Sequence, residues 1–111
     1  MQSHLTYVMK FVADMDRAVR FYRDTLGLPL KFQSPGWSEF ATGEVTLALH
    51  PARDGKPAGS VELGFRVENL ENLHAQGTGS GLTFVGPLRR EHGVLLARFL
   101  DSEDTECSAS E

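Results

Sequence analysis

Several features that commonly place a protein in a class are scarce in this 111-residue sequence. It has one cysteine, Cys107, which permits no internal disulfide and is compatible with a reducing cytoplasm. No apolar run approaches the roughly 20 residues that span a bilayer. The first residues also lack the basic and apolar regions of an export signal. We therefore expect a cytoplasmic protein with no membrane partner, in which Cys107 is a small buried residue.

Positive charge is also in short supply. Eleven Lys and Arg residues face fifteen Asp and Glu residues, and the formal net charge of −4 disfavours nucleic acid as a partner. The sequence contains no glycine-rich phosphate-binding loop and no Gly-x-Ser-x-Gly motif, so nucleotide binding and serine hydrolysis have no support. With 41% hydrophobic residues, the composition is that of a single globular domain over residues 1–111.

The clearest local signal is an amphipathic helix within residues 12–30. Asp14 stands at the N-cap position, and Gly27 followed by Pro29 ends the element. Between them the apolar residues recur at helical spacing, and they are Met15, Ala18, Val19, Tyr22 and Leu26. The spacing predicts a helix over residues 15–26.

The order strand, helix, strand, strand, strand is predicted twice along the chain. The first set covers residues 5–12, 15–26, 30–33, 37–42 and 44–50. Residues 51–59 contain two Pro and two Gly and are expected to form an exposed connector. The second set covers residues 61–67, 69–76, 82–85, 94–100 and 106–110, which indicates an internal duplication. The glycine-rich residues 77–81 should end the second helix early.

Period-two alternation indicates which face of each strand carries which residues. In residues 44–50 the apolar Val45, Leu47 and Leu49 share one face, and they should pack on a helix. The same holds for Val61, Leu63, Phe65 and Val67 in the next strand. The opposite faces then carry small, polar and charged side chains, namely Thr46, Ala48, His50, Glu62, Gly64 and Arg66. Such a face is a candidate ligand surface.

The stretch from Val12 to Leu30 resembles the opening helix of the vicinal oxygen chelate superfamily, which includes glyoxalase I, extradiol dioxygenases and bleomycin- and fosfomycin-resistance proteins. The resemblance implies an α+β fold of paired βαβββ modules, in which two mixed, curved sheets form a cleft with the helices outside. Module 1 would cover about residues 5–50, and module 2 about residues 60–111, within one domain.

The resemblance also implies four places for the ligands of a divalent metal. Counting from Val12, Val67 and Asp101 puts them at Tyr7, Ala48, Glu62 and Ser108. Zn, Ni, Fe or Mn needs three or four His, Asp, Glu or Cys donors, and only Glu62 qualifies. We therefore expect no metal cofactor, although His50, Glu62 and Glu106 could form a displaced site with Tyr7. The other histidines, His4, His74 and His92, are expected to lie on the solvated surface.

The leading hypothesis is a metal-free small-molecule binder of the bleomycin-resistance type. The alternatives are a metal-dependent lyase, isomerase or dioxygenase of glyoxalase type, with Glu62 as the best catalytic candidate, and a protein whose main activity is association. Trp37 fits a cleft wall and a core position equally well. Family members commonly pair their modules between chains, so we expect a homodimer. The expected ligand-binding residues are Tyr7, Met9, Trp37, Glu39, Thr46, Ala48, His50, Glu62, Arg66, Arg98, Glu106 and Ser108.

Overall fold

The computed structural model describes all 111 residues and divides them into two compact units. The N-terminal unit comprises residues 6–62, and the C-terminal unit comprises residues 63–111 together with residues 1–5. No helix in the chain is long and apolar enough to cross a membrane.

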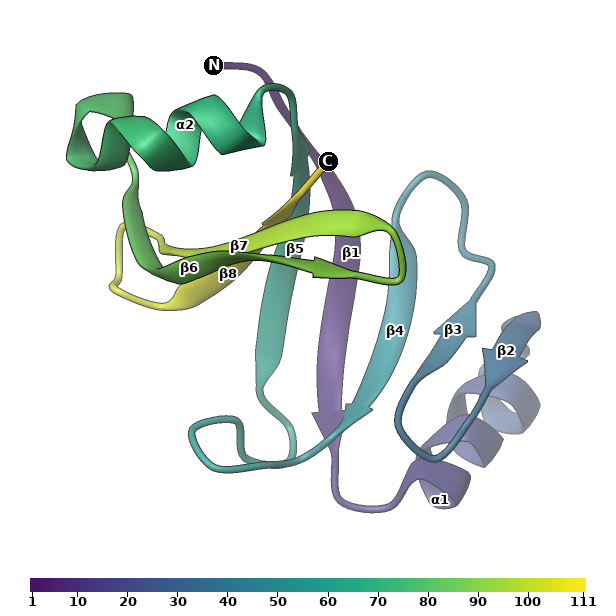
Figure 1. The fold of residues 1–111 in the computed structure, drawn as a ribbon. Helices are drawn as coiled ribbons and strands as arrows, with labels where there is room; N and C mark the ends of the chain where they lie inside the picture. The colour runs from purple at the N-terminus through teal and green to yellow at the C-terminus, as the bar shows by residue number, and fades with distance from the viewer. The chain divides into compact units, whose positions relative to one another are not determined.

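The N-terminal unit has the predicted order strand, helix, strand, strand, strand. Its elements are β1 (Ser3–Val12), α1 (Met15–Arg20), the π-helical turn η1 (Phe21–Thr25), β2 (Leu30–Gln33), β3 (Ser38–Phe40) and β4 (Thr46–Pro51). The strands lie in the order β2-β3-β4-β1. β1 runs parallel to β4, as Figure 1 shows, while β3 is antiparallel to both of its neighbours.

The C-terminal unit repeats this order. Its elements are β5 (Val61–Val67), α2 (Leu70–Gln76), the 3-10 turn η2 (Gly77–Ser80), β6 (Thr83–Glu91), β7 (Val94–Leu100) and β8 (Glu106–Ser110). The strand order is β5-β8-β7-β6, with β5 parallel to β8 and a β6–β7 hairpin (Figure 1). The duplicated order and the equivalent pairings confirm the α+β fold of two βαβββ modules.

The first helix begins and ends as its sequence predicts. The Asp14 carboxylate accepts a hydrogen bond from the Arg17 backbone N–H at 3.0 Å, and Gly27 takes a positive φ of 71° after the last turn. The helix packs on one face of the sheet, where Val19, Phe40 and Leu49 form a fully buried core. This arrangement leaves the other face of the same strands free of any helix of this unit.

The second helix is capped by a residue from the other end of its unit. Asn69, at the N-cap, has a left-handed backbone and makes no side-chain cap. The Glu111 carboxylate instead accepts hydrogen bonds from the backbone N–H groups of Asn69 and Leu70 at 2.8 and 2.9 Å. The helix ends at Gln76 as expected, and Leu70 packs with Val67, Ala97 and Ala109 in the core of this unit.

Four local expectations are wrong. Residues 89–91 continue strand β6 instead of forming a loop, because His92 and Gly93, both with positive φ, make a two-residue hairpin turn. The connector is not uniformly exposed, since the Lys56 side chain is only 13% exposed. His74 is not a solvated surface residue: its ring packs on Phe84, and its Nε2 lies 2.9 Å from the Gly86 carbonyl oxygen. Val61 does not join the core and is 41% exposed.

Candidate functional site

The helix-free face of the N-terminal unit carries the predicted site residues of that half. Strand register places Tyr7 beside Thr46, Met9 beside Ala48, and Glu39 beside Ala48 from the other side. Alternation puts His50 on the same face, because its neighbours Leu47 and Leu49 pack toward α1. Ala48 is fully buried, whereas the Tyr7, Met9, Glu39, Thr46 and His50 side chains are partly exposed.

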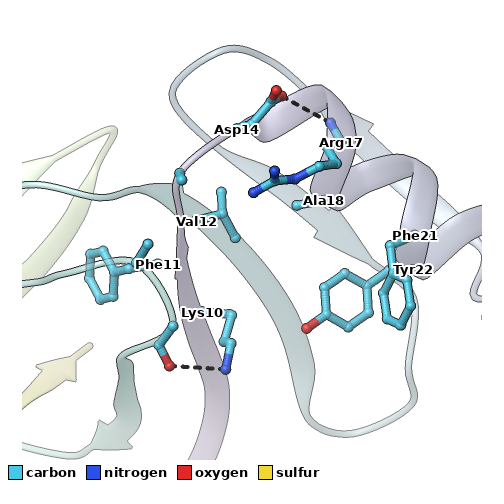
Figure 2. Close-up of a pocket in the computed structure, with 11 residues that line it drawn as sticks. Lys10, Phe11, Val12, Asp14, Arg17, Ala18, Phe21 and Tyr22 are labelled. Carbon is cyan, nitrogen blue, oxygen red and sulfur yellow. Dashed lines mark hydrogen bonds between the residues drawn. The ribbon is translucent and has the colours of Figure 1, made fainter.

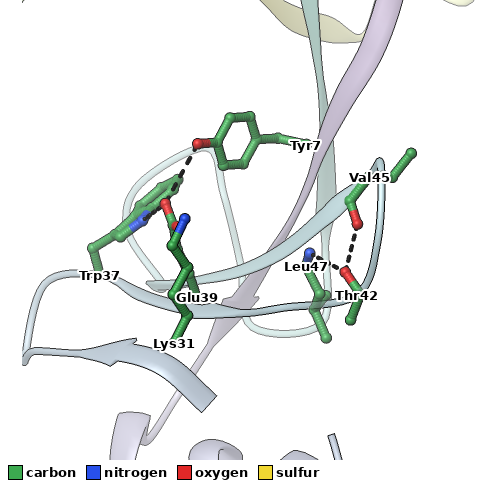
Figure 3. A network of polar contacts seen from close by, with 7 residues as sticks. All are labelled: Tyr7, Lys31, Trp37, Glu39, Thr42, Val45 and Leu47. Atoms are coloured by element: carbon green, nitrogen blue, oxygen red, sulfur yellow. Dashed lines mark hydrogen bonds and ion pairs between the residues drawn. The ribbon is translucent and has the colours of Figure 1, made fainter. Parts of the chain in front are cut away.

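Glu39 is the centre of a polar network on this face, shown in Figure 3. Its Oε1 accepts a hydrogen bond from Trp37 Nε1 at 2.9 Å and a longer one from the Tyr7 hydroxyl at 3.4 Å. Lys31 Nζ lies 3.8 Å from the other carboxylate oxygen. Because Glu39 is mostly shielded and Lys31 mostly exposed, the two hydrogen bonds hold the carboxylate more firmly than the lysine does.

Two aromatic side chains, Trp37 and Tyr7, contact this carboxylate. The Trp37 ring makes edge contacts with Tyr7 and with His50, at centroid distances of 6.1 and 6.2 Å. Trp37 is half-buried and does not belong to either hydrophobic core, so the core position that its sequence context allowed is wrong. We call Tyr7, Trp37, Glu39 and His50 the aromatic cluster.

Two groups of the aromatic cluster have a protonation pattern that the geometry explains. Partial burial and the adjacent Glu39 carboxylate raise the pKa of the Tyr7 phenol above 10.0, so the hydroxyl stays a proton donor. His50 Nδ1 lies 2.8 Å from the Pro51 carbonyl oxygen. Because a carbonyl only accepts, Nδ1 carries a proton in this contact, and Nε2 is the acceptor in the neutral tautomer with that geometry.

Glu62 lies apart from this network in a buried ion pair. It is 3% exposed, and Lys56 Nζ lies 2.9 Å from its Oε1. The angles of this contact do not meet those of a hydrogen bond, so Oε1 is buried with an ion-pair partner alone. The same ammonium lies 5.7 Å from the centroid of the Phe11 ring, whose other neighbours are His50 and Arg53.

The C-terminal unit carries its own predicted residues on the face opposite α2. Strand register aligns Gly64 with Ser108 and Ser108 with Arg98, while Ala97 and Ala109 face the core. Arg98 Nε lies 3.6 Å from a Glu106 carboxylate oxygen, so Arg98, Glu106 and Ser108 share a face as expected. Arg66 is exposed on the same face and makes no ion pair or side-chain hydrogen bond.

The residues at the four implied ligand places do not fit a divalent-metal centre. Tyr7 is hydrogen-bonded to Glu39, Ala48 has no donor, and Ser108 offers a neutral hydroxyl. The remaining ligand, Glu62, has an ammonium at 2.9 Å, and that positive charge repels a second cation. Within either unit, no three His, Cys, Asp or Glu side chains gather closely enough to hold a metal.

A pocket of the N-terminal unit lies on the other side of its sheet, beside α1. It has a volume of about 340 Å³, and Figure 2 shows the Lys10, Arg17 and Tyr22 side chains around it. Lys10 Nζ donates a hydrogen bond to the Gly59 carbonyl oxygen at 3.0 Å, which joins the connector to β1. None of the predicted site residues lines this pocket.

Sequence reasoning missed the residues that reach these sites from outside the regular strand faces. Lys31 joins the aromatic cluster from the edge strand β2, and Lys56 reaches Glu62 from the connector. Phe11 alternates with the helix-facing Val12 on β1, so the period-two pattern could have placed it beside His50. No comparable signal identified Lys56, because its polar surroundings in the sequence are typical of an exposed loop.

The profile of the Glyoxalase/Bleomycin resistance protein/Dioxygenase superfamily matches residues 4–104. A search of curated proteins gave no match. Among solved structures, a hypothetical protein from Bacillus halodurans superposes with a TM-score of 0.75, at 15% identity over 100% of this chain and 95% of that chain.

Two further structures have the same fold. Methylmalonyl-CoA epimerase from Mycobacterium tuberculosis gives a TM-score of 0.74 at 22% identity, over 96% of this chain and 86% of that one. A glyoxalase/bleomycin resistance protein/dioxygenase superfamily member from Vibrio splendidus also gives 0.74, at 13% identity over 98% of both chains. At these identities the structural likeness establishes the fold and leaves the activity open.

Proposed function

Because the chain belongs to the Glyoxalase/Bleomycin resistance protein/Dioxygenase superfamily, we propose that it uses the helix-free face of its N-terminal unit to bind a small molecule without a metal. The ligand is sequestered or sensed and is not transformed. Cytoplasmic location and a homodimeric state are part of this proposal. The rival within the same family is a metal-dependent lyase, isomerase or dioxygenase.

The observation that carries the proposal is the aromatic cluster. A half-buried tryptophan that donates to a shielded carboxylate, with Tyr7 and His50 at its edges, gives a rigid surface of apolar area and few polar groups. Ligand sites of small-molecule binders have this composition. The donor chemistry supports the metal-free form, because the best ligand residue, Glu62, is already neutralised by Lys56.

The free polar groups of the aromatic cluster define the ligand class. Glu39 offers negative charge beside the rings, and His50 Nε2 is an acceptor. These groups favour an aromatic molecule that carries an amine or another hydrogen-bond donor. Arg66 in the C-terminal unit has no protein partner and is available to the carboxylate of another ligand.

Fluorescence titration tests this proposal, because Trp37 is the only tryptophan. A panel of aromatic amines, aromatic amino acids and aromatic acids should give a saturable change in Trp37 emission for at least one compound. Glu39→Gln removes the charge next to the ring and should weaken binding of an amine about tenfold or more. Tyr7→Phe, which removes one hydroxyl from the aromatic cluster, should weaken it less.

Tyr22→Phe is the matched control, since it removes the same hydroxyl on the opposite side of the sheet. It should leave binding unchanged. If Tyr22→Phe weakens binding while Glu39→Gln does not, the ligand occupies the pocket beside α1, and the proposal is wrong. Absence of binding for every class in the panel would also refute it.

Metal content separates the binder from its rival. The purified protein is treated with a chelator, incubated with Zn, Ni, Fe or Mn, and dialysed to remove free metal. Elemental analysis should then find less than one ion per ten chains. Near-stoichiometric metal that is lost in Glu62→Ala would establish the metal-dependent alternative. Ligand binding measured before and after chelation should agree.

A further inference from the structure

The C-terminal unit contains a second polar pocket that the proposed function does not use. It has a volume of about 240 Å³ and is lined by Val85, Gly86, Pro87, Arg89, Arg98 and Glu106. Strand register pairs Val85 with Arg98 and Arg89 with Leu96, and the register shifts between these pairs. The residues of β6 between Val85 and Arg89 therefore form a bulge, and two of them, Gly86 and Pro87, line the pocket.

Both guanidinium groups have donors to spare. Arg98 Nε lies 3.6 Å from Glu106, and Arg89 Nη1 lies 3.6 Å from Glu91, which are ion-pair distances and too long for hydrogen bonds. Neither side chain makes another polar contact with the protein. Each arginine carries five N–H donors in a planar fork that matches a carboxylate or phosphate. Two arginines and one glutamate line the pocket, and Glu91 pairs with Arg89 from outside the lining.

The bulge between the two arginines is held in place from behind. Gly86 has a positive φ of 78°, a backbone conformation that residues with a side chain rarely adopt. His74 on α2 lies with Nε2 2.9 Å from the Gly86 carbonyl oxygen, and its ring packs on Phe84. The helix thus fixes the bulge, and a fixed wall is what an anion site needs to bind without further ordering of the chain.

We propose that this pocket binds an oxyanion, a carboxylate or phosphate group, between Arg89 and Arg98. The site lies within the C-terminal unit and needs no contribution from the aromatic cluster. It goes beyond the proposed function, because it predicts anion recognition whether or not an aromatic ligand binds.

Nuclear magnetic resonance of the full chain tests the site directly. The protein is titrated with sodium phosphate and, separately, with sodium acetate at constant ionic strength, with chloride as the background anion. The Nε–H signals of Arg89 and Arg98 and the Gly86 amide should shift and saturate together. Saturation with phosphate alone assigns a phosphoryl group, saturation with acetate alone assigns a carboxylate, and saturation with both assigns either.

Substitutions identify the residues responsible. Arg98→Ala should weaken the anion about tenfold or more, and Arg98→Lys should weaken it as well, because the charge remains but the fork is lost. Arg90→Ala is the matched control. It removes the same charge one residue further along β6, on the opposite face and outside the pocket, and should change affinity less than twofold.

Two results would overturn the inference. One is a linear, non-saturating response to both anions, and the other is an equal loss in Arg90→Ala and Arg98→Ala, which would indicate diffuse charge attraction. A failure of this site is distinct from a failure of the proposed function. If only the anion site fails, Trp37 emission still responds to an aromatic ligand while the arginine signals do not respond to anions. If only the proposed function fails, the arginine signals respond and Trp37 emission does not.

Discussion

Replacing Lys56 by methionine removes the ammonium from Glu62 and keeps an unbranched side chain that is one atom shorter. In the native unit the two side chains are 13% and 4% exposed, and Glu62 Oε1 has no hydrogen-bond donor. The variant leaves a carboxylate buried without a partner. Removal of one member of a buried ion pair costs about 3–5 kcal/mol, because desolvation of the remaining charge is no longer offset.

Substitution of Lys56 and substitution of Glu62 should not cost the same stability. Lys56 lies in the connector and has a flexible side chain that can turn to solvent when Glu62 is neutralised. Glu62 is on strand β5 and cannot leave without breaking the strand. Glu62→Gln should therefore cost less than Lys56→Met. The double variant Lys56→Met/Glu62→Leu removes both charges and should recover most of the loss.

Urea unfolding and thermal unfolding, both followed by Trp37 emission, measure these changes. For a chain of this size a loss of about 3–5 kcal/mol should lower the midpoint temperature by roughly 12–20 °C. Lys31→Met is the control, since Lys31 is 67% exposed and 3.8 Å from its carboxylate, and a surface pair of this kind contributes at most about 1 kcal/mol. Equal effects of Lys56→Met and Lys31→Met, or no recovery in the double variant, would refute the buried-pair argument.

Three further results are expected. The raised pKa of Tyr7 means that the folded state holds the phenol proton more tightly than the unfolded state. The contribution of Tyr7 to folding stability is therefore complete below pH 10.0 and is lost as pH rises through the folded pKa. Tyr22→Phe leaves Tyr7 as the only tyrosine. In that background, a pH titration followed by tyrosinate absorbance should give a lower pKa for Tyr7 when Glu39 is replaced by Gln. Glu111→Ala should reduce stability by about 1–2 kcal/mol in urea unfolding, because two backbone N–H groups of α2 lose their acceptor, whereas Glu103→Ala should have little effect. Light scattering should give twice the 12.2 kDa chain mass at micromolar concentration, and a monomer there would contradict the dimer.

Local chemistry explains why several elements could be predicted from the sequence. Strands β2, β5, β7 and β8 begin and end at the predicted residues, since Pro and Gly or an Asp turn flank most of them. The Asp14 cap and the Gly27 stop act within one turn of the helix they bound. Each of these signals lies within a few residues of the element that it bounds. The bounds can therefore be predicted without knowing which distant residues pack against the element.

The errors arise where distant residues decide the structure. Gly86 and Pro87 predict a break after residue 85, but pairing with β7 continues the strand beyond them as a bulge. The α2 cap comes from Glu111, 41 residues from Leu70, and depends on how β8 pairs with β5. Neither feature has a local signature.

The candidate site shows the same division. Alternation correctly placed Thr46 and His50 on the helix-free face, because a strand has only two faces and the apolar residues identify one of them. Alternation could not show that Glu39 accepts hydrogen bonds from both Trp37 and Tyr7, which depends on the turn before β3. It also could not show that the only carboxylate at an implied metal-ligand place is already neutralised.

Neutralisation of Glu62 by Lys56 changes what this carboxylate can do. A carboxylate that binds a metal or moves a proton needs access to its partner and a free lone pair. Glu62 is 3% exposed, and the connector holds an ammonium against it through the paired backbone hydrogen bonds of Arg53 and Lys56. Its charge is therefore used to fix the connector on the N-terminal unit. The partly exposed polar groups of that unit, Glu39 and His50, lie beside aromatic rings, where recognition of a ligand is the chemistry that they support.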